Sequence, residues 1–105
     1  MCDTRTLSSR NNTYISHCVG CRSVSLWHNN LIVSFTPELF FAFSNLIRRY
    51  SFADGAMPFP DELERIMIRL PHKDFTMAFT EAEWENLGEV VEEALYMRQI
   101  YEMLE

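Results

Sequence analysis

The chain is poor in glycine, and none of its three glycines stands in a pattern that binds phosphate or supports catalysis. The sequence contains no P-loop, no G-x-G-x-x-G, no G-x-S-x-G and no H-E-x-x-H. These absences exclude the common nucleotide-binding, hydrolase and zinc-protease signatures. We therefore expect a protein that is not an enzyme.

Long apolar runs are absent as well. No stretch approaches the roughly 20 apolar residues that a membrane-spanning helix needs. Residues Met1–Arg5 lead into polar residues with no apolar run behind them, so we expect no secretory signal. An apolar content of 48% in 105 residues is enough for one core. These features predict one cytoplasmic domain, residues 13–105, behind a flexible polar tail of residues 1–12.

Positive charge is scarce in the second half of the chain. Residues 1–52 carry five arginines against two acidic residues, a net charge of +3. Residues 53–105 carry four basic residues against thirteen acidic ones, a net charge of −9. The acidic half would repel a phosphate backbone, and the arginines of the first half are scattered. We therefore expect no general binding to nucleic acid.

Two segments share a pattern when the sequence is shifted against itself by 44 positions. The first copy covers about residues 18–50 and the second about residues 62–104. Few letters are identical, but the apolar and turn positions agree, which is typical of a structural duplication. The identities are Leu26 with Leu70, His28 with His72, Phe35 with Phe79, and Thr36 with Thr80.

Each copy has the pattern of two short strands followed by a helix. Apolar residues alternate at period two around residues 24–35 and again around residues 66–79, with turn-forming residues between the strands. Thr36 and Thr80 stand where a helix N-cap is expected. We therefore predict an α+β fold built from a duplicated ββα unit. Its sheet has four strands and is mainly antiparallel, with the two helices on one face.

A pair of cysteines, Cys18 and Cys21, has no counterpart in the second copy. Two thiols separated by two residues, with a glycine before the second, are typical of half a zinc knuckle. Zinc needs four ligands, and His17 is the candidate that lies beside the pair. One prediction is therefore a zinc site that uses Cys18, Cys21 and His17.

Two other interpretations of the cysteine pair stay open. A redox role needs a stabilised thiolate, which many proteins obtain by placing the first cysteine at a helix N-terminus. Here a strand pattern follows the pair instead. Cysteine also packs as a small apolar residue, so the third interpretation is a tight turn without chemistry.

The second predicted helix is longer than the first. It starts after Thr80 and continues towards Leu104, and its end is apolar on more than one face. The apolar residues that the core does not need are Tyr96, Met97, Ile100, Met103 and Leu104. Such a stripe usually marks an interface, most commonly of a symmetric homodimer, unless residues 51–61 fold over it. The sequence thus predicts a non-enzymatic interaction or structural domain that self-associates through its C-terminal helix.

One known group of proteins has the same order of features. The cysteines Cys18-x-x-Cys21 are followed by an apolar strand, a turn, a strand ending in Phe35-Thr36 and an aromatic-rich helix. Over residues 18–47 this order resembles a family of small uncharacterised bacterial domains of unknown function, of the Bacteroidetes type. The resemblance implies a stand-alone cytosolic domain, and its cysteine pair suggests a metal. It implies no catalytic residues.

Overall fold

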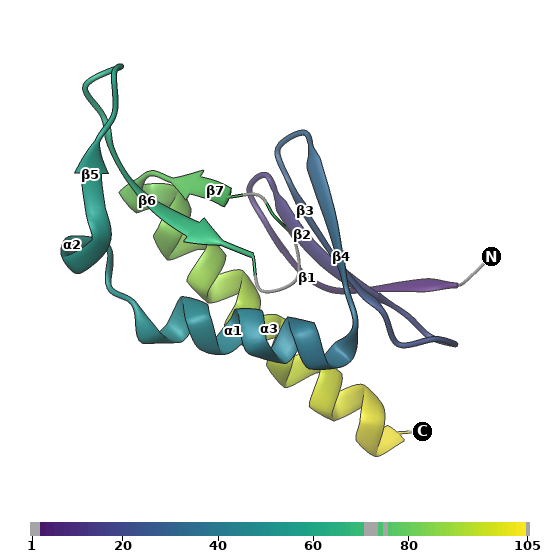
Figure 1. Cartoon of the computed structure of the whole chain (residues 1–105). Helices are drawn as coiled ribbons and strands as arrows, with labels where there is room; N and C mark the ends of the chain where they lie inside the picture. Colours follow the sequence, from purple (N-terminus) through teal and green to yellow (C-terminus); the bar gives the residue numbers. More distant parts are fainter. Residues whose placement is uncertain (1–2, 71–73, 75, 105) are drawn as a thin grey trace.

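The computed structural model describes residues 3–70, 74 and 76–104, which form two antiparallel sheets and two long helices (Figure 1). The first sheet contains β1 (Thr4–Arg10), β2 (Thr13–Cys18), β3 (Val24–His28) and β4 (Leu31–Phe35). The second contains β5 (Ala56–Pro58), β6 (Glu64–Arg69) and β7 (Thr76–Phe79). The helices are α1 (Pro37–Arg49), the short α2 (Phe52–Gly55) and α3 (Glu81–Leu104).

The first sheet is a meander in which each strand pairs with the next along the chain. Asn11 and Asn29 begin two of its tight turns in the left-handed conformation, with φ of 56°, which asparagine tolerates. Alternate side chains point towards α1 and α3 and are buried there. These core residues are Leu7, Ile15, Val24, Leu26, Val33 and Phe35. A four-stranded antiparallel sheet is present, but all its strands come from the first 35 residues, whereas the predicted sheet took two strands from each copy.

Strand β1 lies where the sequence predicts a flexible tail, so this prediction is wrong for Thr4–Arg10. Most residues of β1 are polar, and a bulge between Thr6 and Ser8 interrupts the alternation that would have identified a strand. The bulge places both Leu7 and Ser8 towards the core, each 3% exposed. The Ser8 hydroxyl donates a hydrogen bond to the carbonyl oxygen of Val90 at 2.7 Å, which satisfies a buried polar group.

The second predicted hairpin lies in the second sheet, where β6 pairs with both β5 and β7. Its core-facing residues follow the predicted period of two: Ile66, Ile68, Met77 and Phe79. Two strands and a helix do occur in each predicted copy, but the strands belong to different sheets. The duplicated ββα unit is therefore not confirmed. The turn predicted at residues 71–74 lies mostly outside the described residues.

Helix α3 joins the two sheets. It contacts β1 and β2 of the first sheet and β6 and β7 of the second. Its buried side chains are Trp84, Leu87, Val90, Val91 and Ala94. The predicted difference in helix length is confirmed, since α3 has 24 residues and α1 has 13. Within the described part of the chain, no helix combines the length and apolarity required to cross a membrane.

Both long helices begin after the predicted threonine caps. Thr36 Oγ1 accepts a hydrogen bond from the backbone N–H of Leu39 at 3.2 Å, and Thr80 Oγ1 accepts one from that of Glu83 at 3.3 Å. The Glu83 carboxylate accepts in return from the N–H of Thr80 at 2.9 Å. This reciprocal pair is a capping box, which fixes where α3 begins.

Replacing Thr80 with alanine is expected to lower the free energy of unfolding by about 1 kcal/mol, because a first-turn N–H of α3 loses its acceptor. Chemical denaturation followed by circular dichroism measures the change. Thr80→Ser keeps the hydroxyl and should retain most of the stability. An unchanged midpoint in Thr80→Ala would show that this cap does not stabilise the helix.

Candidate interaction surface

The predicted zinc ligands do not converge on one point. His17 is 2% exposed, and its ring lies against that of Tyr101 in α3, with the centroids 6.1 Å apart. Cys18 is the next residue of β2, and successive strand side chains point to opposite faces. Cys21 is exposed, in the loop after β2. Of the residues that the structure describes, no group of three His, Cys, Asp or Glu side chains could hold a metal ion.

The two cysteines themselves are close, because the N–H of Cys21 donates to Sγ of Cys18 at 3.3 Å. Cys18 is disulfide-bonded, and Cys21 takes no part in that disulfide. Zinc binds thiolates, so metal binding by this pair would need a reduced chain. The zinc site stays a prediction, and metal analysis of protein purified with reductant and without chelator tests it. Zinc at trace level only would end the hypothesis.

The thiol of Cys21 is expected to be more acidic than an ordinary cysteine. The Ser23 hydroxyl, 3.2 Å from the sulfur, and then the Ser23 backbone lower the pKa of Cys21 by hydrogen bonding to the thiolate. Ser23→Ala should therefore raise this pKa, and alkylation by iodoacetamide should reach half its maximal rate at a higher pH. Cys21→Ser is the control, because it removes this thiol and so shows which part of the alkylation comes from Cys21. The same midpoint in Ser23→Ala and the unmodified protein would contradict the assigned cause.

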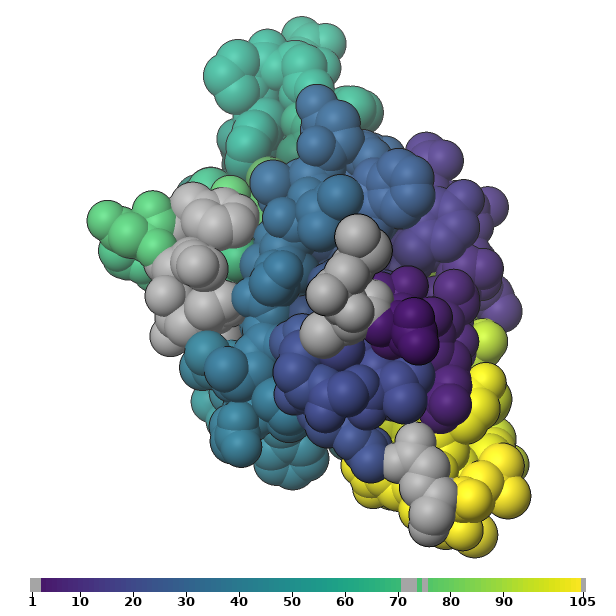
Figure 2. Space-filling model, turned by 90° about the vertical axis from the view of Figure 1, so that its right-hand side faces the viewer, coloured from purple at the N-terminus to yellow at the C-terminus, as the bar shows by residue number. Residues whose placement is uncertain are grey.

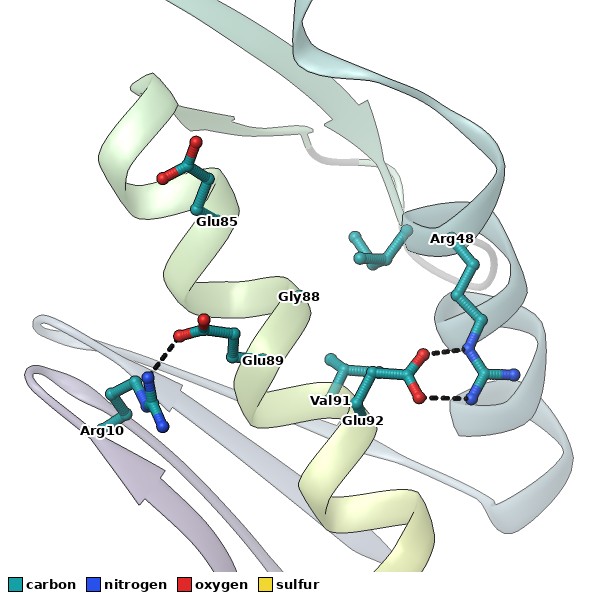
Figure 3. A pocket seen from close by; sticks show the side chains of 8 residues that line it. Arg10, Arg48, Glu85, Gly88, Glu89, Val91 and Glu92 are labelled. Carbon is teal, nitrogen blue, oxygen red and sulfur yellow. Dashed lines mark hydrogen bonds and ion pairs between the residues drawn. The ribbon is translucent and has the colours of Figure 1, made fainter.

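The first half of α3 presents a charged surface outward. A groove of about 700 Å³ runs along it, bordered by two ion pairs (Figure 3). Arg48 of α1 donates to both carboxylate oxygens of Glu92, at 2.6 and 3.1 Å, and Arg10 of β1 pairs with Glu89. These exposed pairs connect α3 to the first sheet and to α1, and each adds at most about 1 kcal/mol of stability.

Gly88 lies in this groove, inside α3, and a Cβ added there would meet no atom within 4 Å apart from the nearby backbone of the helix itself. Glycine inside a helix costs about 1 kcal/mol relative to alanine, so Gly88→Ala is expected to raise the free energy of unfolding by about that amount. Gly55→Ala is a control expected to gain nothing, because its Cβ would lie 2.9 Å from Cδ1 of the buried Ile66. Thermal unfolding compares the two, and a lower melting temperature in Gly88→Ala would contradict the expectation.

The second half of α3 carries an apolar stripe, formed by Tyr96, Ile100, Met103 and Leu104 and called here the α3 stripe. Tyr96, Met103 and Leu104 are 62%, 82% and 76% exposed, and Ile100 is half-buried. Positions three and four residues apart share one helix face, so these side chains lie together. These side chains are exposed, so residues 51–61 do not cover them. The alternative prediction, in which residues 51–61 fold over the stripe, is therefore wrong.

The opposite side of the same helical turns is fixed to the domain. Three of its side chains pack against the core: Leu95, Met97 and Tyr101. The sequence predicts Met97 in the uncovered stripe, and for this residue the prediction is wrong. The guanidinium of Arg5 lies 4.0 Å from the centroid of the Tyr101 ring, and that of Arg98 lies 5.7 Å from the centroid of the Phe40 ring. The end of α3 is thus held in place while the α3 stripe remains uncovered within the described chain.

On a neighbouring side of the same turns of α3, α1 and α3 enclose a notch of about 220 Å³. Phe41 of α1, which is 57% exposed, forms one of its walls. The other wall residues are Arg48, Leu95, Arg98, Gln99 and Glu102. An apolar centre with a charged rim is the usual composition of a protein interface. Phe41, the notch and the α3 stripe together form the candidate interaction surface.

Sequence reasoning finds the α3 stripe but misses the groove beside Gly88. The groove depends on Arg10 and Arg48, which the fold brings to α3 from distant positions. Only Gly88 itself was a signal, because an isolated glycine is unfavourable inside a helical pattern.

The chain belongs to a family of unknown function, DUF6686, whose family model matches residues 1–104. This confirms the predicted resemblance to a family of unknown function and extends it from residues 18–47 to nearly the whole chain. No curated protein and no solved structure matches the chain.

Proposed function

We propose that this member of the family is a non-enzymatic interaction domain that forms a homodimer through the C-terminal half of α3. The observation that carries the proposal is the α3 stripe, whose Tyr96, Met103 and Leu104 are more than 60% exposed on a helix that is otherwise packed against its domain. Apolar patches of this kind on monomeric proteins are usually functional.

The supports of the helix end favour a preformed interface. Tyr101 is held by Arg5 and by the ring of His17, so the last turns of α3 lose little freedom when a partner binds. A surface that is already ordered keeps more of its contact energy as affinity. A two-fold arrangement would place the α3 stripe of each copy against that of the other, with Phe41 and the notch at the side.

The charge distribution along α3 favours overlap of the C-terminal halves only. Glu85, Glu89 and Glu92 face outward in the first half of the helix, and two of them pair with arginines of their own chain. An antiparallel contact over the full helix would place these carboxylates against the apolar α3 stripe of the other copy, and burying a charge without a partner is unfavourable. A contact limited to the last three turns avoids this cost.

Hydrogen exchange at low and high protein concentration tests the proposed surface. We expect slower exchange at high concentration in residues 95–104 and in α1 around Phe41, because dimer formation removes these turns from solvent. Exchange in β5 and β6 serves as the control, since these strands expose Met57 and Met67 without belonging to the surface. Concentration-independent exchange along α3, or protection at the control strands instead, would contradict the proposal.

A further inference from the structure

The outer face of the first sheet, turned away from α1 and α3, carries a second exposed apolar cluster. Tyr14 of β2 pairs across the ladder with Trp27 of β3, and Trp27 pairs with Ile32 of β4. These three residues, called here the aromatic row, are 40%, 47% and 64% exposed. Figure 2 views the molecule from the side of this sheet, whose strands are purple to blue.

The two aromatic rings are held in a fixed arrangement. Their centroids are 5.0 Å apart and their planes are inclined by 30°, so they form one slightly bent platform. Nε1 of Trp27 donates to the carbonyl oxygen of Asn29 at 2.6 Å, which fixes the indole and satisfies its polar atom. The exposed surface of the Trp27 ring is therefore apolar and preorganised.

A row of hydroxyl groups crosses the sheet beside the aromatic row. The cross-strand partners are Thr6 with Ser16, Ser16 with Ser25, and Ser25 with Ser34. Neither row contains an acidic or basic residue. The arginines of β1 lie on the other side of the sheet, where Arg5 stacks on Tyr101 and Arg10 pairs with Glu89. The face thus combines aromatic rings and hydroxyls without charge.

We propose that this outer face binds a neutral carbohydrate, with a pyranose ring stacked on Trp27 and Tyr14. The C–H groups on one face of a pyranose are attracted to the negative face of an aromatic ring, as its quadrupole requires. Its hydroxyls need neutral donors and acceptors at the side, and Ser16 and Ser25 occupy that position. The proposal does not depend on homodimer formation through α3.

The lack of charge and the small exposed area of this face favour a carbohydrate over nucleic acid and over a second protein. Single-stranded nucleic acid also stacks on aromatic rings, but its backbone needs a track of cations, which the two rows lack. A second protein needs about 800 Å² of contact on each partner, whereas the aromatic row exposes on the order of 300 Å². A few sugar rings match the smaller area.

Isothermal titration calorimetry of the full chain with four neutral hexasaccharides tests the proposal: cellohexaose, maltohexaose, chitohexaose and mannohexaose. We expect saturable binding of at least one probe, weakened by about tenfold in Trp27→Ala and in Tyr14→Ala, as loss of one stacking contact implies. Tyr50→Ala is the matched control, because Tyr50 is 46% exposed at the end of α1, away from the two rows. It should bind like the unmodified protein.

Three outcomes would overturn the proposal. The first is the absence of saturable heat with all four probes. The second is a probe that binds Trp27→Ala or Tyr14→Ala, folded by circular dichroism, as tightly as it binds the unmodified protein. The third is dissociation of an oligomer by Trp27→Ala, which would assign the aromatic row to a contact between copies of the chain.

Discussion

The double substitution Tyr96→Glu/Met103→Glu is expected to convert the proposed homodimer into a monomer. Both side chains are exposed on the α3 stripe, at 62% and 82%, so the glutamates are solvated in the monomer and leave its fold intact. In the dimer the same carboxylates would be buried against apolar neighbours and near each other. Like charges in an interface cost several kcal/mol, so the dissociation constant should rise by more than about 100-fold.

Sedimentation velocity over a range of concentrations measures this change. Met57→Glu/Met67→Glu is the matched control, because these methionines are 44% and 48% exposed on the second sheet. The control should sediment like the unmodified protein. If the control dissociated the dimer while Tyr96→Glu/Met103→Glu did not, the interface would lie on the second sheet.

Replacing Leu87 with alanine is expected to lower the free energy of unfolding by about 3 kcal/mol, through lost burial and the cavity left behind. Leu87 has no exposed surface and lies in α3, which contacts both sheets. Because the two sheets share this helix, they should unfold in one transition at a lower denaturant concentration. Leu63→Ala is the control, since Leu63 is 51% exposed, and it should change stability by less than about 0.5 kcal/mol.

Guanidinium denaturation followed by both far-ultraviolet circular dichroism and tryptophan fluorescence tests this expectation. Trp27 reports on the first sheet, and Trp84 reports on α3. Coincident transitions in the unmodified protein and in Leu87→Ala would agree with one shared core. Separate transitions in circular dichroism and in tryptophan fluorescence would show that the sheets are independent units.

Features that depend on neighbouring residues could be predicted from the sequence. The β3–β4 hairpin follows from apolar alternation around Leu26 and Val33, and both long helices follow from their threonine caps. These signals are local, because strand alternation and capping hydrogen bonds involve residues only a few positions apart.

The assembly of the sheets could not be predicted in the same way. Strand β1 is polar and bulged, so its core-facing pair Leu7 and Ser8 breaks the alternation on which strand prediction relies. Whether two hairpins share a sheet depends on contacts between distant segments, here the packing of both sheets on α3. Two segments with similar sequence patterns therefore need not place their strands in the same sheet.

The same distinction applies to the two candidate sites. The α3 stripe was predictable, because its apolar residues exceed what one helix face can bury in the domain. His17, Cys18 and Cys21 are close together in the sequence. His17 and Cys18 are neighbours in a strand, however, and neighbouring strand residues point to opposite faces. The structure accordingly directs His17 to Tyr101 while Cys18 lies beside Cys21.

Light scattering of the unmodified protein after size-exclusion chromatography shows whether the chain self-associates. At tens of micromolar, we expect a mass twice that of one chain, falling towards that of one chain on dilution. A mass equal to one chain at every concentration would contradict self-association and would leave the exposed α3 stripe for a partner of a different sequence.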